Sequence, residues 1–226
     1  MPMRTISGGP WRRLRWLVIS PHPDDETLGA GALIAQTARE GRLAGIVYLT
    51  DGSGSHPVEA AGALVRTRRR EADLAIRRLT GKSIIPIHLG WPDASPHLAG
   101  EAGFETSCRA LAALCDARRV DILAVTASHE PHCDHAAAAH LAHAVRDAAR
   151  RRLQLVEYLV WGHRPMSAAT MRVATAPMAP GTRRHALRAH RSQLSAAYGP
   201  GFRLPPAASR MPARDILYHA RPRHAA

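Results

Sequence analysis

The residues best suited to chemistry in this sequence lie in one short stretch, where His22 precedes two adjacent carboxylates, Asp24 and Asp25. The apolar run over residues 14–19 predicts a β-strand before this stretch, and an amphipathic run starting at Glu26 predicts a helix after it. His22 and the two Asp side chains are therefore expected at the carboxyl end of a strand. Open α/β sheets bind their ligands at that edge.

The spacing of these residues suits a metal ion. His22 and Asp25 are three residues apart across a turn, so both can reach one ion, and this pair of ligands suits Zn²⁺ and is tolerated by other divalent ions. Asp24 would stay free to accept a proton from a metal-bound water. The alternative is that Asp24 or Asp25 only caps the helix, with Glu26 favouring its positive end. Capping explains one Asp but not the neighbouring His22, so we favour the metal site.

A second group of polar residues follows another predicted strand, residues 120–126, and precedes an Ala-rich predicted helix. His132 and His135 are three residues apart in this group, and Asp134 is available to hold an imidazole by its second nitrogen. A third metal ligand is expected from this group, because it follows a strand just as the first group does.

The two groups together resemble motifs of the LmbE-like, or PIG-L, family of zinc-dependent N-deacetylases, which remove acetyl groups from N-acetylglucosaminyl conjugates and related N-acyl sugars. The motifs are Pro-His-Pro-Asp-Asp-Glu over residues 21–26 and the pattern His132-x-Asp134-His135. The resemblance extends over residues 13–194 and implies an N-acylated sugar conjugate as the substrate.

The resemblance also implies roles for individual residues. The ligands of Zn²⁺, or of another divalent metal ion, would be His22, Asp25 and His135. Asp24 would be the general base, and His132, paired with Asp134, would stabilise the oxyanion or act as the acid.

A substrate contact is implied within the basic run of residues 66–70, which resembles the Arg-Glu-Ala segment of the family. We align Arg70 with the Arg of that segment, since Arg suits bidentate contacts to sugar hydroxyls or phosphate. The other arginines of the run, Arg66, Arg68 and Arg69, are expected on the outer face of a helix.

Two more residues are implied at the substrate pocket. Asp93 follows a predicted strand over residues 83–89 and would lie at the pocket rim, with an ordinary turn as the alternative. His56 ends a Gly/Ser-rich loop that resembles the loop flanking the pocket, and the alternative is a solvated loop residue.

The sequence departs from the family at Cys133, which stands where Pro is usual. Its position between His132 and Asp134 predicts that the thiol points away from the metal. A serine or cysteine hydrolase using Ser55 or Cys133 is disfavoured, because no nucleophile elbow is present.

Alternating strand and helix patterns predict an α/β fold: a doubly wound, mostly parallel, Rossmann-like sheet in three α/β/α layers. The length of 226 residues predicts a single domain over residues 1–226, and the resemblance implies that it is a deacetylase domain. Residues 1–10 are expected to form a loose N-terminal arm and residues 205–226 a flexible tail. Residues 171–176 are expected as an edge strand and residues 182–197 as one helix.

The net charge of +13 comes from dispersed arginines without interleaved aromatic residues, so a solvated basic surface and no nucleic-acid partner are expected. The alternative is a catalytically inactive member of the fold that uses this surface to bind an anionic glycan or nucleic acid. The intact ligands and base argue against it.

The three cysteines form no paired framework and suggest a reducing compartment. Cys108 and Cys115 are expected as buried small hydrophobic residues. The apolar run over residues 14–19 is too short for a secretion signal or a membrane span. We therefore expect a cytoplasmic protein without membrane insertion, and a homo-oligomer is compatible with the sequence.

Overall fold

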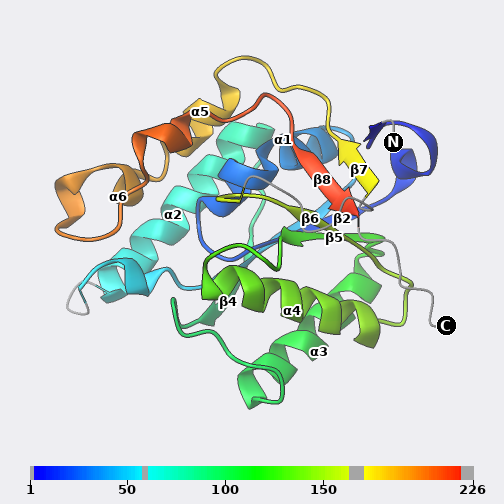
Figure 1. Ribbon diagram of the computed structural model, residues 1–226, viewed down its shortest axis with the longest axis horizontal. Coiled ribbons are helices and arrows are strands. Elements are labelled where there is room, and N and C mark those ends of the chain that lie inside the picture. Colours follow the sequence, from blue (N-terminus) through cyan, green and yellow to red (C-terminus); the bar gives the residue numbers. More distant parts are fainter. Residues whose placement is uncertain (1–2, 58–60, 163–170, 220–226) are drawn as a thin grey trace.

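The structure is a computed structural model that describes residues 3–57, 61–162 and 171–219. Within these residues, eight strands form one sheet in the order β1-β7-β8-β6-β5-β2-β3-β4 (Figure 1). β8 runs antiparallel to β6 and β7, and all other neighbouring pairs are parallel. The strands are β1 (Arg4–Thr5), β2 (Trp16–Ser20), β3 (Leu43–Thr50), β4 (Ile87–Trp91), β5 (Ile122–Thr126), β6 (Gln154–Tyr158), β7 (Met171–Ala174) and β8 (Ile216–His219).

Helices cover both faces of this sheet, as the sequence predicts for a doubly wound fold (Figure 1). On one face pack α1, α2 and α5, and on the other pack α3 and α4. The helices are α1 (Asp25–Arg39), α2 (Ala61–Thr80), α3 (Ala102–Ala117), α4 (Cys133–Ala148), α5 (Thr182–Leu187) and α6 (Arg191–Leu194). Short 3₁₀ turns cover Gly9–Arg13, Ser53–Ser55, Ala196–Tyr198 and Pro206–Ser209.

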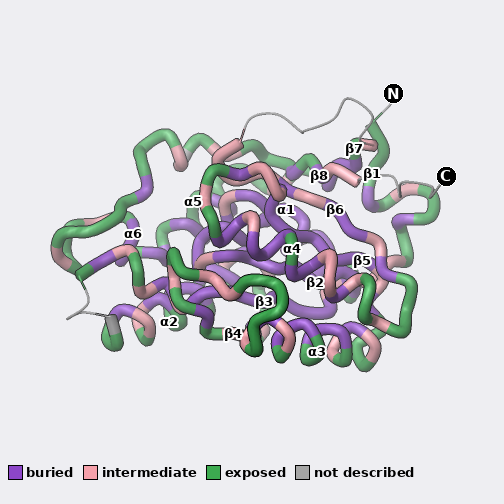
Figure 2. The backbone as a smooth tube through the Cα atoms, turned by 60° about the horizontal axis from the view of Figure 1, so that its bottom comes forward, coloured by how far each residue is buried: buried purple, intermediate pink, exposed green. Residues whose placement is uncertain are grey.

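The central strands are buried on both faces (Figure 2). In β2, Leu17 and Ile19 contribute to the core under α3 and α4, whereas Trp16 and Val18 contribute to the core under α1 and α2. The alternation follows from the two-residue period of a strand. Each fully buried aliphatic side chain of this kind stabilises the fold by about 1.5–3 kcal/mol, so the strand ends that carry the site are held rigidly.

α1 approaches the sheet closely through Gly29. A Cβ atom at this position would lie 2.4 Å from Cδ2 of Tyr158 on β6, so only glycine fits. Tyr158 in turn donates a hydrogen bond of 2.8 Å to the carbonyl oxygen of Ile19 on β2. These contacts fix the start of α1 against the sheet edge where Asp25 lies.

The predictions for both ends of the chain were wrong. β1 pairs with β7 and is followed by the fully buried Ile6, so residues 4–6 are part of the sheet and its core. β8 inserts between β6 and β7, preceded by the buried Asp215, which pairs with the buried Arg183. The gain from these strand pairs and from the buried ion pair explains why these segments are ordered. Residues 220–226 lie outside the described part of the chain.

Two predicted elements also differ from the structure. β7 lies between β1 and β8 and is therefore not an edge strand. The helix expected over residues 182–197 is split into α5 and α6, because the chain turns at the fully buried His190. The backbone N–H of Ser192 then donates to the carboxylate of Glu71 at 2.8 Å. Cys108 and Cys115 are buried, as predicted.

None of the helices in the described ranges combines the length and the apolar character that crossing a membrane would need.

Candidate metal centre and active site

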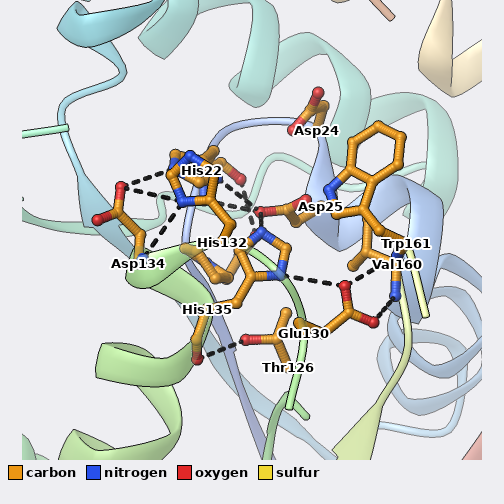
Figure 3. Close-up of polar contacts among 12 residues, drawn as sticks. His22, Asp24, Asp25, Thr126, Glu130, His132, Asp134, His135, Val160 and Trp161 are labelled. Carbon is orange, nitrogen blue, oxygen red and sulfur yellow. Dashed lines mark hydrogen bonds and ion pairs between the residues drawn. The ribbon is translucent and has the colours of Figure 1, made fainter. Parts of the chain in front are cut away.

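Two neighbouring strands bring the two sequence motifs to one place. β2 leads to His22 and to the start of α1 at Asp25, and β5, which pairs with β2, leads to His135 in the first turn of α4. Oδ2 of Asp25 lies 3.0 Å from Nδ1 of His22 and 3.2 Å from Nε2 of His135 (Figure 3). The three residues predicted as metal ligands are therefore brought together.

This group fits a divalent metal ion. One ligand atom from each of His22, Asp25 and His135 lies within 4.8 Å of the others. His135 is fully buried, and its Nε2 atom makes no hydrogen bond of good geometry. Two imidazole nitrogens and a carboxylate oxygen are a typical donor set for catalytic zinc, which keeps a further position open.

Protonation compensates the buried carboxylate of Asp25 when no cation does so. Burial alone lowers the pKa of His135, but its interactions with Asp25 and Glu130 together outweigh burial and raise this pKa to about 9. Burial alone raises the pKa of Asp25, but His135 and His22 hold it far below its usual value. A metal ion must therefore displace protons from this site as it binds.

Asp134 lies closer to His22 than to His132. Its Oδ2 atom is 2.8 Å from Nε2 of His22 and 3.8 Å from Nδ1 of His132. His22, Asp93, His132 and Asp134 form a second group of close donor atoms, also within 4.8 Å of one another. Because a metal-binding imidazole commonly donates its other N–H to a carboxylate, we interpret Asp134 as the partner of His22 in this arrangement.

His132 is the N-cap of α4 and accepts the backbone N–H of Asp134 through its Nδ1 atom at 3.2 Å. A neutral His132 therefore carries its proton on Nε2. Burial and the nearby His22 lower the pKa of His132, and Asp134 raises it by less. The close partner of the Asp134 carboxylate is therefore His22 and not His132 as predicted, and Asp134 bonds His132 through its backbone N–H.

Asp24 has the geometry of a functional residue. It is 3% exposed, with φ of 130° and ψ of −33°, a backbone conformation that costs free energy in a non-glycine residue. Its side chain makes no hydrogen bond to the first turn of α1, so it does not cap the helix. Instead, Nε2 of Gln193 donates to Oδ2 of Asp24 at 2.6 Å. Burial and the charge of Asp25 raise the pKa of Asp24 to about 8.

Behind Asp24, buried polar contacts join α1 and α2 to residues 190–193. Oε1 of Glu26 lies 3.2 Å from Nε2 of His190, and Glu71 accepts a hydrogen bond from Oγ of Ser192 at 2.5 Å. His190 is therefore engaged in the structure rather than in metal binding. The contact of His190 with Glu26 holds Gln193 beside Asp24, because His190 and Gln193 belong to the same short segment.

A cavity of about 480 Å³ opens onto these residues, within the usual range for small-molecule sites of about 300–1,000 Å³. Its floor is polar and its wall is aromatic, with Trp161 and Phe202 in edge-to-face contact at a centroid distance of 6.3 Å. The ionisable residues that line the cavity are His22, Asp24, Asp25, Arg68, Asp93 and His132.

Arg68, and not Arg70, faces the cavity. Arg70 is exposed and is not among the lining residues, so the structure contradicts its assignment to the pocket. The prediction that Arg68 lies on the outer face was wrong, because it is 2% exposed and its Nε and Nη2 atoms have no hydrogen-bond partner. Its Nη1 atom is 4.0 Å from Oδ2 of Asp93. Arg66 and Arg69 are exposed as expected.

The other two residues expected at the pocket differ in their positions. Asp93 lines the cavity, where Oδ1 lies 3.4 Å from Nε2 of His22 and Oδ2 accepts the backbone N–H of Gly54 at 3.1 Å. His56 is buried, contacts Oγ of Ser55 at 2.9 Å and is not among the lining residues. It is thus neither a solvated loop residue nor at the cavity.

Sequence reasoning missed Glu130 and gave Gln193 no role. Glu130 is 5% exposed, lies 3.5 Å from Nδ1 of His135 and accepts three backbone hydrogen bonds. Burial raises the pKa of Glu130, but His135 and these N–H groups outweigh burial and lower it. Its only signal in the sequence is an acidic residue two positions before His132. Cys133 is exposed, belongs to neither group of donor atoms within the described ranges and contacts Oδ1 of Asp134 at 3.5 Å.

Comparison with known proteins identifies a family whose members resemble this chain. The family model for PIG-L, described as GlcNAc-PI de-N-acetylase, matches residues 17–146. The curated 2'-N-acetylparomamine deacetylase of Streptomyces fradiae is 38% identical over 73 residues, which cover 31% of this chain and 26% of that protein. The match thus spans about a quarter of the relative's length.

Solved structures share the fold. The N,N'-diacetylchitobiose deacetylase of Pyrococcus horikoshii has a TM-score of 0.60 at 21% identity, over 80% of this chain and 71% of that one. A teicoplanin deacetylase in its zinc-inhibited form has a TM-score of 0.60 at 17% identity, over 91% of this chain and 97% of that one. A 4-carboxy-2-hydroxymuconate hydratase of Pseudomonas putida has a TM-score of 0.55 at 18% identity, over 80% of each chain. These identities show the fold alone, and the hydratase shows that the fold also carries another reaction.

Proposed function

Because the chain belongs to the GlcNAc-PI de-N-acetylase (PIG-L) family, we propose that it is a metal-dependent hydrolase that removes the acetyl group from the nitrogen of an N-acetylglucosamine-type sugar conjugate. The observation that carries the proposal is the convergence of His22, Asp25 and His135 within 4.8 Å of one another, with Asp24 lining the same cavity as His22 and Asp25. A ligand set with an adjacent base suits hydrolysis of an amide.

Zn²⁺, or another divalent ion held by these three residues, would act as a Lewis acid and lower the pKa of a water molecule. Asp24 accepts a proton from the water that attacks the acetyl carbonyl. The hydrogen bond from Gln193 holds the Asp24 carboxylate in one orientation, and general-base catalysis depends on that orientation. Asp24 then returns the proton to the nitrogen, which leaves as a free amine while acetate is released.

His132 is placed to stabilise the oxyanion that develops during attack. It lines the cavity, and its Nδ1 atom is occupied by the N–H of Asp134, which leaves Nε2–H free to donate. A donor aimed at a developing oxyanion contributes about 3–4 kcal/mol to catalysis. Asp134 supports the reaction through His22, and through its backbone N–H it orients His132.

The remaining lining residues suit a sugar conjugate. Arg68 presents two buried nitrogens without partners, Nε and Nη2, whose hydrogens can be donated to hydroxyl or phosphate oxygens. Asp93 can accept hydrogen bonds from sugar hydroxyls, and the wall of Trp161 and Phe202 offers aromatic surface to the apolar face of a sugar ring. This division into a polar floor and an aromatic wall favours an amino sugar over a purely apolar amide.

The test is a hydrolysis assay with purified, Zn²⁺-loaded protein and a series of N-acetylglucosaminides that differ in the group at the anomeric position. Amine and acetate should appear in equal amounts, and both should be lost in Asp24→Asn. If metal and sugar bind but no amine is released from any member of the series, the chain would instead be the inactive binding protein considered above.

A further inference from the structure

Glu130 is buried between two parts of the site that the sequence keeps 25 or more residues apart, the ligand group and the segment after β6 (Figure 3). On one side, its Oε2 atom lies 3.5 Å from Nδ1 of His135. The other ring nitrogen of His135, Nε2, faces Asp25 at 3.2 Å. Glu130 is thus on the far side of the imidazole from the metal-binding atom.

On its other side, Glu130 accepts the backbone N–H groups of three successive residues. Oε1 accepts from Val160 at 3.0 Å and from Gly162 at 2.9 Å, and Oε2 accepts from Trp161 at 2.9 Å. A Cβ atom at Gly162 would lie 3.0 Å from Oε1. The segment therefore wraps closely around one carboxylate, and its side chain Trp161 forms the aromatic wall of the cavity.

We propose that Glu130 is a positioning residue that fixes the metal ligand His135 and the cavity-wall residue Trp161 relative to each other. The inference rests on the metal site of the proposed function. A carboxylate that accepts the second N–H of a ligating imidazole fixes its tautomer and ring orientation. Here the same carboxylate also holds three backbone N–H groups of residues 160–162. Glu130 therefore links the aromatic wall of the cavity to the metal ligand His135.

The role requires a carboxylate. Three backbone N–H groups donate to its two oxygens, and Nδ1 of His135 lies 3.5 Å from Oε2. An amide has one acceptor oxygen, so in Glu130→Gln the NH₂ group must face at least one of these donors in either orientation. Shape is retained while the pairing is broken, and both the metal ligand and the wall should loosen.

The experiment compares wild type with Glu130→Gln and with the control Glu157→Gln. Glu157 is a partly buried acidic residue on β6 that accepts the N–H of Ser128 at 3.3 Å. Zn²⁺ affinity is measured by competition with a chelator, and the visible spectrum of the Co²⁺ form reports the ligand geometry. Iodide quenching reports Trp161, because Trp11, Trp16 and Trp91 are at most 3% exposed.

In Glu130→Gln we expect a Zn²⁺ affinity about 10- to 100-fold weaker, an altered Co²⁺ spectrum and stronger quenching of Trp161, with Glu157→Gln unchanged in all three. None of the three measurements needs a substrate. A failure of this proposal can therefore be distinguished from a failure of the protein to deacetylate. Wild-type metal affinity, or wild-type quenching of Trp161, in Glu130→Gln would overturn the proposal. Should that variant not fold, Gly162→Ala keeps every charge and should shift the same readouts by displacing Oε1.

Discussion

Replacing Arg68 by Met should separate stability from function. Arg68 is 2% exposed, yet Nε and Nη2 have no hydrogen-bond partner, and its nearest ion pair, to Asp93, is 4.0 Å long. Burial lowers the pKa of the guanidinium, and the surrounding carboxylates offset only part of that effect. We therefore expect the buried cation to contribute little to folding and to be available for a ligand.

The magnitudes follow from this imbalance. Removing one partner of a well-paired buried ion pair costs about 3–5 kcal/mol, but Arg68→Met should leave the free energy of unfolding within about 1 kcal/mol of wild type, or raise it, because little pairing is lost. Hydrogen bonds from a charged group to the substrate are worth about 1.5–3 kcal/mol. At about 1.4 kcal/mol per factor of ten, kcat/KM should fall roughly 10- to 150-fold.

Arg70→Met is the matched control, since Arg70 lies two residues away on the exposed side of α2. It should change neither the urea unfolding curve nor kcat/KM in the amine-release assay. A loss of 3 kcal/mol or more in Arg68→Met would show that Arg68 is a paired structural residue. An equal loss of kcat/KM in Arg70→Met would show that the cavity has been assigned to the wrong arginine.

Three other perturbations test the centre itself. His22→Ala, Asp25→Ala and His135→Ala should each lower metal content measured by elemental analysis, and full occupancy in all three would remove the ligand assignment. Asp24→Asn should keep its metal while kcat falls on the order of 10²-fold or more, and a wild-type rate would mean that another residue is the base. Because the pKa of His135 is about 9, protons compete with metal below that pH. The Zn²⁺ affinity in a chelator titration should therefore rise from pH 7 to pH 9, and a flat profile would contradict the protonation of this site.

The proximity of His22, Asp25 and His135 could be predicted because it depends on short spacings along the sequence. His22 and Asp25 are separated by one turn at a strand end, and the same holds for His132 and His135. Strand-end chemistry and parallel pairing of β2 with β5 are enough to bring such groups together. The strand predicted over residues 120–126 agrees with β5, Ile122–Thr126, for the same reason, since a continuous apolar run fixes a buried strand.

The arginine that faces the cavity was misassigned because a family motif was aligned without regard to helix phase. In the run of residues 66–70 several arginines compete for the same motif position. The inward positions of α2 include Ala72, Ala75 and Ile76, all fully buried. Arg68 lies four residues before Ala72, on the same face, whereas Arg70 does not. Helical periodicity alone would have selected Arg68.

The supporting residues could not be predicted, because their partners are remote in sequence. Glu130 contacts residues 160–162, and Gln193 contacts Asp24 across 169 positions. The C-terminal strand β8 was missed for a similar reason, since four residues in a Pro- and Arg-rich segment carry too weak a pattern to reveal that they pair with β6 and β7. Such contacts are settled by tertiary packing, not by spacing along the chain.

The distribution of charge favours a cation in the interior of this basic chain. Of 18 acidic residues, six are buried in or directly behind the site: Asp24, Asp25, Glu26, Glu71, Glu130 and Asp134. Carboxylates so close together cannot all stay ionised without positive partners. His22 and His190, whose pKa values are raised, supply part of that charge. A divalent ion at His22, Asp25 and His135 would supply the rest and would return Asp24 to the ionised form that a general base must have.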